Sequence, residues 1–217
     1  MKKIVKSDLQ KELKELPKEL DELLDAVISG DLSDQSNPSI KSIAEFIRIR
    51  RLLDQESDRG CVLFAASHMD HKLSILFQKI LIGNKTHLDS ILAFNGPLGS
   101  FSSKTKLAYS LGILRRKEFE DIEVLRKIRN EFAHSIETLA FQDLKIKQLI
   151  RNFKLLANPD HDNPKYHFIS IVGLIFSRLD YSFREATKFR EPTELDSVNF
   201  KEALEMAKNI GIQELKL

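Results

Sequence analysis

The sequence predicts an all-α protein that folds as one compact helical bundle. Only 8 Gly and 6 Pro interrupt the 217 residues, and Leu, Ile, Lys and Glu dominate, which favours helices over sheets. Hydrophobic residues make up 42% and charged residues 30%, enough apolar material for a sizeable core. In most segments the apolar residues recur every three or four positions, the spacing of one helical face.

The first half of the chain contains three predicted helices. Residues 7–29 form an amphipathic segment with leucines at helical spacing, which Pro17 kinks and Gly30 ends. After a polar linker at residues 33–38, a second helix covers residues 39–53. The third, at residues 56–82, is the longest and most apolar, so we expect it to lie at the centre of the bundle.

The second half contains shorter predicted helices. We expect them at residues 86–94, 102–111, 117–133, 166–187 and 197–210, with a less regular stretch at 138–155 and a loop at 158–164. This pattern divides the chain into an N-terminal helical arm (1–32), a helical domain (38–188) and a C-terminal helix that packs on the domain (189–217).

Composition also restricts the cellular compartment and the kinds of ligand that we expect for the protein. An N-terminal apolar run is absent, as is any stretch of about 18 apolar residues, so the sequence predicts neither a signal peptide nor a spanning helix. The single Cys61 suits a reducing compartment, and we expect a cytoplasmic protein without a membrane partner or cofactor. A formal charge of +2 does not by itself indicate nucleic-acid binding.

The predicted helix at 117–133 faces the core with the stripe of Ile122, Leu125, Ile128 and Phe132. It ends in a cluster of polar side chains. Asn130 and His134 lie four residues apart and therefore on one face, with Arg126 one turn earlier and Arg129 beside it. A cation, an amide and an imidazole together suit chemistry on a phosphate. The alternative is a helix C-cap with solvent-exposed Arg129 and Asn130, in which helix carbonyls favour a charged His134.

Two family resemblances follow from these residues. Arg129 followed by Asn130, with His134 four residues further on, resembles the Arg-x4-His signature of the HEPN superfamily, many members of which are ribonucleases. A longer stretch is similar to the bacterial mannitol operon repressor family: a GPLG turn at residues 96–99, a Lys-Leu-x-Tyr segment that ends at Tyr109, and the helix that ends at His134. This second resemblance covers roughly residues 60–150.

Asp70 lies in the middle of the long apolar helix, where an unpaired carboxylate is costly. We therefore expect a cation beside it, Arg126 or Arg129, and the resemblance also implies an acidic residue near the site. His68 and His71 flank Asp70, but two histidines three residues apart supply at most two ligands, so the sequence predicts no zinc site.

A basic surface is the second candidate site. Between residues 102 and 129, eight Lys and Arg residues stand against four Asp and Glu residues, which suits RNA, another anion or an acidic protein. The residues that we expect to bind are Lys104, Lys106, Arg115, Arg116 and Arg126. The GPLG turn and its serines either cradle an anion at a helix N-terminus or serve as a tight turn with helix caps, and the second interpretation is favoured.

These observations support two functions. The first is a regulator similar to the mannitol operon repressors, which works through protein partners or nonspecific charge because the sequence contains no recognised DNA-binding motif. The alternative is a metal-independent HEPN-type ribonuclease, a toxin or defence effector, with Arg129, Asn130, His134 and Asp70 as catalytic residues. Either protein is expected to be a homodimer, with a further partner that is a regulator or an antitoxin, and RNA as a second candidate ligand.

Overall fold

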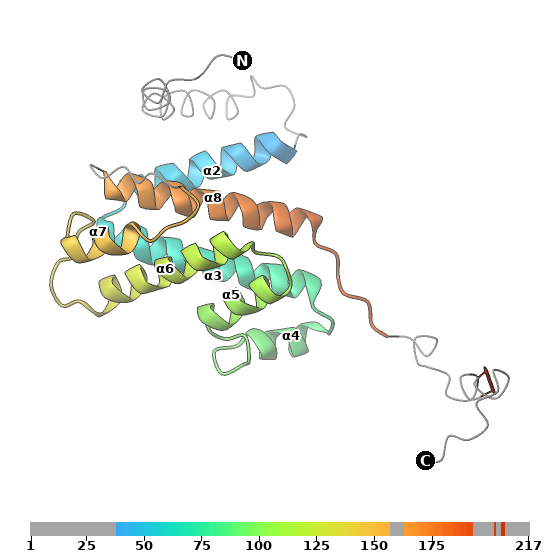
Figure 1. The fold of residues 1–217 in the computed structure, drawn as a ribbon. Coiled ribbons are helices and arrows are strands. Elements are labelled where there is room, and N and C mark those ends of the chain that lie inside the picture. Colours follow the sequence, from blue (N-terminus) through green and yellow to red (C-terminus); the bar gives the residue numbers. More distant parts are fainter. Residues whose placement is uncertain (1–37, 157–162, 193–201, 203–204, 207–217) are drawn as a thin grey trace.

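The computed structural model describes residues 38–156 and 163–192, together with residues 202, 205 and 206. Within these ranges the elements are all helices, which confirms the predicted all-α class (Figure 1). The elements are α2 (Pro38–Gln55), α3 (Asp58–Ile80), α4 (Lys85–Leu92), α5 (Phe101–Ser110), α6 (Arg116–His134), α7 (Leu144–Ile150) and α8 (Pro164–Glu185).

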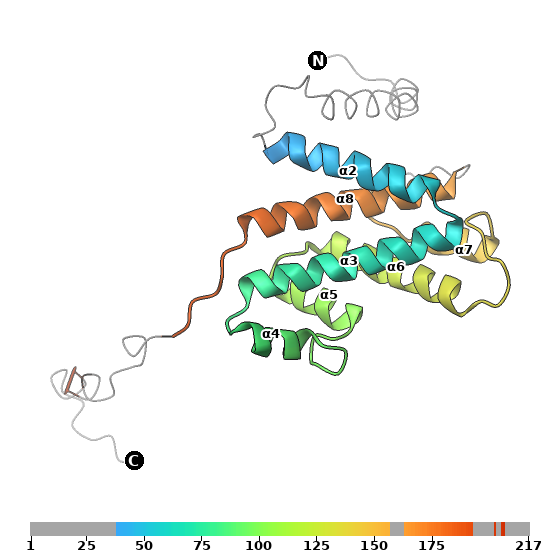
Figure 2. The ribbon, with the colours of Figure 1, turned by 180° about the vertical axis from the view of Figure 1, so that it is seen from behind.

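Helix α3 is the centre of the bundle, as its apolar sequence predicts. It contacts α2, α5, α6 and α8, and α2 runs along α8 on one side of it (Figure 2). Nine of its residues are buried, among them Met69, Leu73 and Phe77. Helix α6 faces α3 with the expected stripe of Ile122, Leu125, Ile128 and Phe132, each 0% exposed.

Polar side chains determine where several helices begin. The side chains of Ser57, Asn84, Ser100 and Asn163 each accept a hydrogen bond from a backbone N–H in the first turn of α3, α4, α5 and α8. These bonds satisfy donors that have no partner within the helix. Pro164 follows Asn163 at the start of α8, where the missing N–H of proline costs nothing.

A close helix–helix contact positions α2 against α8. Gly173 is buried in α8, and a Cβ at this position would clash with the ring of Phe46 on α2. Because glycine leaves this space open, the aromatic ring lies directly on the α8 backbone. The contact brings α2 onto the bundle although it precedes α8 by more than a hundred residues.

The helix bounds agree with the sequence prediction to within a few residues for the helices at 39–53, 56–82, 86–94, 102–111, 117–133 and 166–187. The stretch at 138–155 contains only the short α7. The arm at 7–29 lies outside the described residues, as does most of the helix predicted at 197–210. Residues 189–192 are not helical, and the Phe189 N–H donates to the carbonyl of Ile80.

Candidate functional site

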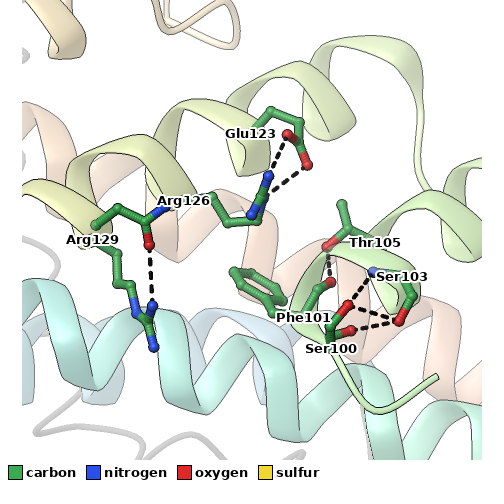
Figure 3. A network of polar contacts seen from close by, with 8 residues as sticks. Ser100, Phe101, Ser103, Thr105, Glu123, Arg126 and Arg129 are labelled. Carbon is green, nitrogen blue, oxygen red and sulfur yellow. Dashed lines mark hydrogen bonds and ion pairs between the residues drawn. The ribbon is translucent and has the colours of Figure 1, made fainter. Parts of the chain in front are cut away.

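The predicted catalytic residues at the end of α6 are exposed. Arg129, Asn130 and His134 all face solvent, because the opposite side of the helix is buried on α3. The Arg129 guanidinium donates to the side-chain oxygen of Asn130 over 3.1 Å (Figure 3). His134 has no side-chain hydrogen bond within the described part of the chain. The three side chains therefore lie together on one surface, but they do not enclose a substrate.

Asp70 has a cationic partner, and the partner is Lys104 rather than an arginine. The Lys104 ammonium lies 2.7 Å from the Asp70 carboxylate and donates to the Ser74 hydroxyl over 2.9 Å. Arg126 instead pairs with Glu123 in its own helix over 3.1 Å. The expected pairing of Asp70 with Arg126 or Arg129 is wrong, because α5 packs beside this face of α3.

Lys104 also corrects the predicted basic surface. It is 3% exposed, so its ammonium group pairs with Asp70 between α3 and α5 and is not accessible to RNA or another anion. An ammonium at the surface was expected from the run of basic residues around it. The side chain lies in the helix interface instead, where its buried ammonium is paired with the half-buried carboxylate of Asp70.

Most of the other cations predicted to bind RNA are neutralised by carboxylates of α6. Arg115 pairs with Glu118 over 2.6 Å, and Arg116 pairs with Glu120 over 2.8 Å. Lys106 is exposed and has no carboxylate partner within the described residues. The excess of basic residues in this stretch therefore does not create a continuous unpaired face.

The GPLG turn requires glycine at both of its ends, because neighbouring backbone atoms leave no room for a Cβ there. A Cβ on Gly96 would collide with the carbonyl oxygen of Ser90, and a Cβ on Gly99 would collide with that of Ala93. The turn leads into Ser100, whose hydroxyl oxygen accepts from the N–H of Ser103 over 3.0 Å (Figure 3). These contacts support the interpretation of the motif as a tight turn with a helix cap.

Two buried titratable groups have shifted pKa values. Burial raises the pKa of the Cys61 thiol to about 12, so it stays protonated and is a poor nucleophile at neutral pH. Burial also raises the pKa of Asp121, although its carboxylate accepts hydrogen bonds from the backbone N–H groups of Lys154 and Leu155 at 2.6 and 3.0 Å. Asp121 therefore fastens the segment after α7 onto α6.

Beside that segment lies a groove that the sequence analysis missed. The α6–α7 groove has a volume of about 380 Å³, and Phe119, Val124 and Leu149 form its apolar lining. The ring of Phe119 stacks on Tyr109 of α5, with 4.7 Å between ring centroids. The lining comes from two segments about thirty residues apart, which no local motif connects.

The polar lining of the α6–α7 groove carries both signs of charge. Glu120 and Glu123 belong to it, and so do Lys127, Asn152 and Lys154. The two carboxylates pair with arginines of α6, whereas the two lysines form no ion pair among the described residues. The groove is therefore an amphipathic surface with a local excess of positive charge.

Other kinds of site receive no support from the described residues. They contain no group of three or more His, Cys, Asp or Glu side chains that is able to hold a metal ion. None of their helices is both long and apolar enough to cross a lipid bilayer.

The fold and these surfaces define a helical domain with an exposed cluster and a shallow groove, suited to contacts with other macromolecules. The family model described as "Mannitol repressor" matches residues 48–168, more than half of the sequence. The chain belongs to the mannitol repressor family.

Two curated relatives, both named mannitol operon repressor, come from strains of Escherichia coli. Each is 31% identical over 102 residues, which is 45% of this chain and 52% of the relative. The chain thus spans about half the length of the curated relatives it matches. The solved structure of an MtlR–HPr complex from E. coli is 22% identical, with a TM-score of 0.48, and covers 65% of this chain and 97% of its own. These comparisons give no support to a ribonuclease or a toxin.

Proposed function

We propose that this chain is a regulator of the mannitol operon repressor type and that it acts through a protein partner. The observation that carries the proposal is the family match over residues 48–168, which includes α3, α5, α6 and α7 in full. These helices contain the GPLG turn, the exposed end of α6 and the α6–α7 groove. The region that this chain shares with the family is thus the region that presents its candidate surfaces.

The distribution of charge favours a protein partner over direct reading of DNA. Sequence-specific proteins present side chains to base edges and additional cations to phosphates. Here Arg115, Arg116 and Arg126 are each paired with a glutamate of α6, and Lys104 is buried. Few unpaired cations remain on α5 and on the N-terminal half of α6 to contact a phosphate backbone.

The test compares DNA binding with partner binding. Purified full-length chain is titrated into a labelled fragment of the mannitol operon control region and into a scrambled fragment of equal length and composition. We expect equal, salt-sensitive and weak binding to both fragments, because only nonspecific charge is available. Clear preference of the isolated chain for the operon fragment at physiological salt would contradict the proposal.

Partner binding is measured in the same preparation by isothermal titration calorimetry. HPr from E. coli, the protein present in the solved complex of the relative, serves as the first probe. Deletion of the gene should also raise expression of a reporter placed behind the mannitol operon promoter, and wild-type chain should restore repression. An unchanged reporter in the deletion strain would argue against a regulatory role at this operon.

The ribonuclease alternative requires residues from two copies of the chain. Arg129 is bonded to Asn130, and His134 stands exposed beside them without an enclosing pocket. A site of this kind needs the same residues from a second copy, so it depends on a homodimer with the end of α6 at its two-fold axis. Both the homodimer and the composite site stay predictions, tested below.

A further inference from the structure

The chain between residues 144 and 157 is strongly basic. It contains Lys145, Lys147, Arg151 and Lys154 and no Asp or Glu. Lys145 pairs with Glu131 of α6 over 2.5 Å. The other three cations form no ion pair within the described part of the chain, and only Lys154 lies close enough to Asp121 to lower the pKa of that carboxyl group. Folding therefore leaves a local positive surface on α7 and the turn after it.

This positive surface adjoins the α6–α7 groove. Lys154 lines the groove, and Lys127 of α6 lines it as a further exposed cation without a carboxylate partner in the described chain. Val124 and Leu149 contribute apolar surface to the same lining. With a volume of about 380 Å³, the groove is at the lower end of the range of ligand pockets, large enough for one or two side chains.

The position of Lys154 is fixed by the fold. Its backbone N–H donates to the carboxylate of Asp121, which is 0% exposed on the inner side of α6. The next residue, Leu155, donates to the same carboxylate. This wall of the groove is therefore held in place before any ligand binds, which lowers the conformational cost of binding.

We propose that the α6–α7 groove binds an acidic segment of a partner protein that inserts an apolar side chain between α6 and the segment after α7. The inference rests on the proposed function, in that the chain works through a protein partner. Carboxylates of the segment lie against Lys127 and Lys154, and its apolar side chain contacts Val124 and Leu149. Charges at the edge of such a contact guide association, and the apolar contact stabilises the complex.

The groove chemistry favours a protein segment over a single-stranded nucleic acid. Nucleic-acid bases bind on free aromatic faces, and one face of Phe119 is already covered by Tyr109. An apolar side chain of a peptide needs no free aromatic face, because Val124 and Leu149 of the groove supply an aliphatic surface for it.

The test uses the full chain and a defined peptide probe. A fluorescein-labelled eight-residue peptide of Asp and Glu with Leu-Phe at its centre is titrated with protein, and anisotropy is recorded. We expect saturable 1:1 binding that weakens as salt rises, because the contacts at the rim are ionic. A peptide with Ser-Ser in place of Leu-Phe should bind at least about fivefold more weakly.

Charge-reversal variants locate the binding site. Lys127→Glu combined with Lys154→Glu should weaken peptide binding about tenfold or more, since two attractive contacts become repulsive. The matched control, Lys85→Glu combined with Lys117→Glu, makes the same change of net charge at exposed positions outside the groove and should change affinity less than about twofold. Circular dichroism confirms that each variant keeps its helices.

Several results overturn the proposal. They are absence of saturable binding to wild-type protein, equal loss in the control pair, or equal affinity for the Ser-Ser peptide. Tighter binding of a twelve-residue oligouridine, lost in the same groove variant, would assign the groove to nucleic acid instead. The operon-fragment and reporter assays use no groove variant, so the proposed regulatory function stands or falls separately from this inference.

Discussion

Asp121 provides the sharpest test of how the fold holds the candidate surface together. The carboxylate is 0% exposed and accepts two backbone hydrogen bonds, from Lys154 at 2.6 Å and Leu155 at 3.0 Å. Asp121→Ala removes both acceptors and leaves two partly buried N–H groups without a partner. At roughly 1–3 kcal/mol for each such group, we expect a loss of about 2–6 kcal/mol in the free energy of unfolding.

Asp121→Asn separates the hydrogen bonds from the charge. The amide oxygen still accepts one bond, while its NH₂ group faces the second donor, so the expected loss is about 1–3 kcal/mol. Asp143→Ala is the matched control. It removes one hydrogen bond, from the Ala140 N–H at 2.8 Å, at a half-buried site that water reaches, and should cost about 1 kcal/mol.

The shifted pKa of Asp121 adds a dependence on pH. Because burial raises its pKa in the folded state, the folded protein holds this proton more tightly than the unfolded chain does. Protonated Asp121 therefore stabilises the folded protein fully at pH values below the ordinary Asp pKa of about 3.9. This stabilisation is lost as pH rises through the pKa of Asp121 in the folded protein. The stability of wild type relative to Asp121→Asn should fall as pH rises across that window.

Urea denaturation followed by circular dichroism, repeated from acidic to neutral pH, measures both effects. The difference in free energy of unfolding between wild type and variant at each pH cancels the contribution of other groups that titrate in both proteins. A loss below about 0.5 kcal/mol for Asp121→Ala, or an equal loss for Asp143→Ala, would refute the argument. If the free energy of unfolding of wild type rises relative to that of Asp121→Asn as pH rises, the sign of the pKa effect is wrong.

Three further outcomes are expected. Gly173→Ala should lower the free energy of unfolding by about 1–3 kcal/mol through its clash with Phe46, and should cost less in a Phe46→Ala background, as thermal melts will show. Purified chain should not cleave single-stranded RNA in the presence of a chelator, and cleavage that is abolished by Arg129→Ala and by His134→Ala would contradict that expectation. Neither substitution should lower the free energy of unfolding by more than about 0.5 kcal/mol, because both side chains are exposed. Light scattering should find a homodimer, and a strict monomer at micromolar concentrations would exclude a composite site.

Local sequence predicted much of the described fold. The apolar spacing of α6 identified the buried stripe that ends at Phe132, and the chain's longest apolar helix is the central α3. These features are readable because helix periodicity and capping depend on residues within a few positions of each other. The stretch at 138–155 was harder, since only the short α7 forms there and its neighbours are held by tertiary bonds to Asp121 and Asp58.

The candidate surface was only partly predictable. The exposure of Arg129, Asn130 and His134 follows from their place opposite the apolar stripe of α6. The partner of Asp70 did not follow, because Lys104 lies thirty-four residues further along the chain and reaches it only when α5 packs on α3. A count of basic residues also overlooked the carboxylates that neutralise Arg115 and Arg116.

The sequence by itself determined the helical class, the face that α6 buries and the resemblance to the mannitol repressor family, because these depend on residue type and short-range spacing. Only the tertiary structure decided which charges stay available. Lys104 is buried between helices, whereas Lys127 and Lys154 meet at the α6–α7 groove from segments far apart in the chain. Ion pairing and groove formation depend on distances in space, and helix packing sets those distances.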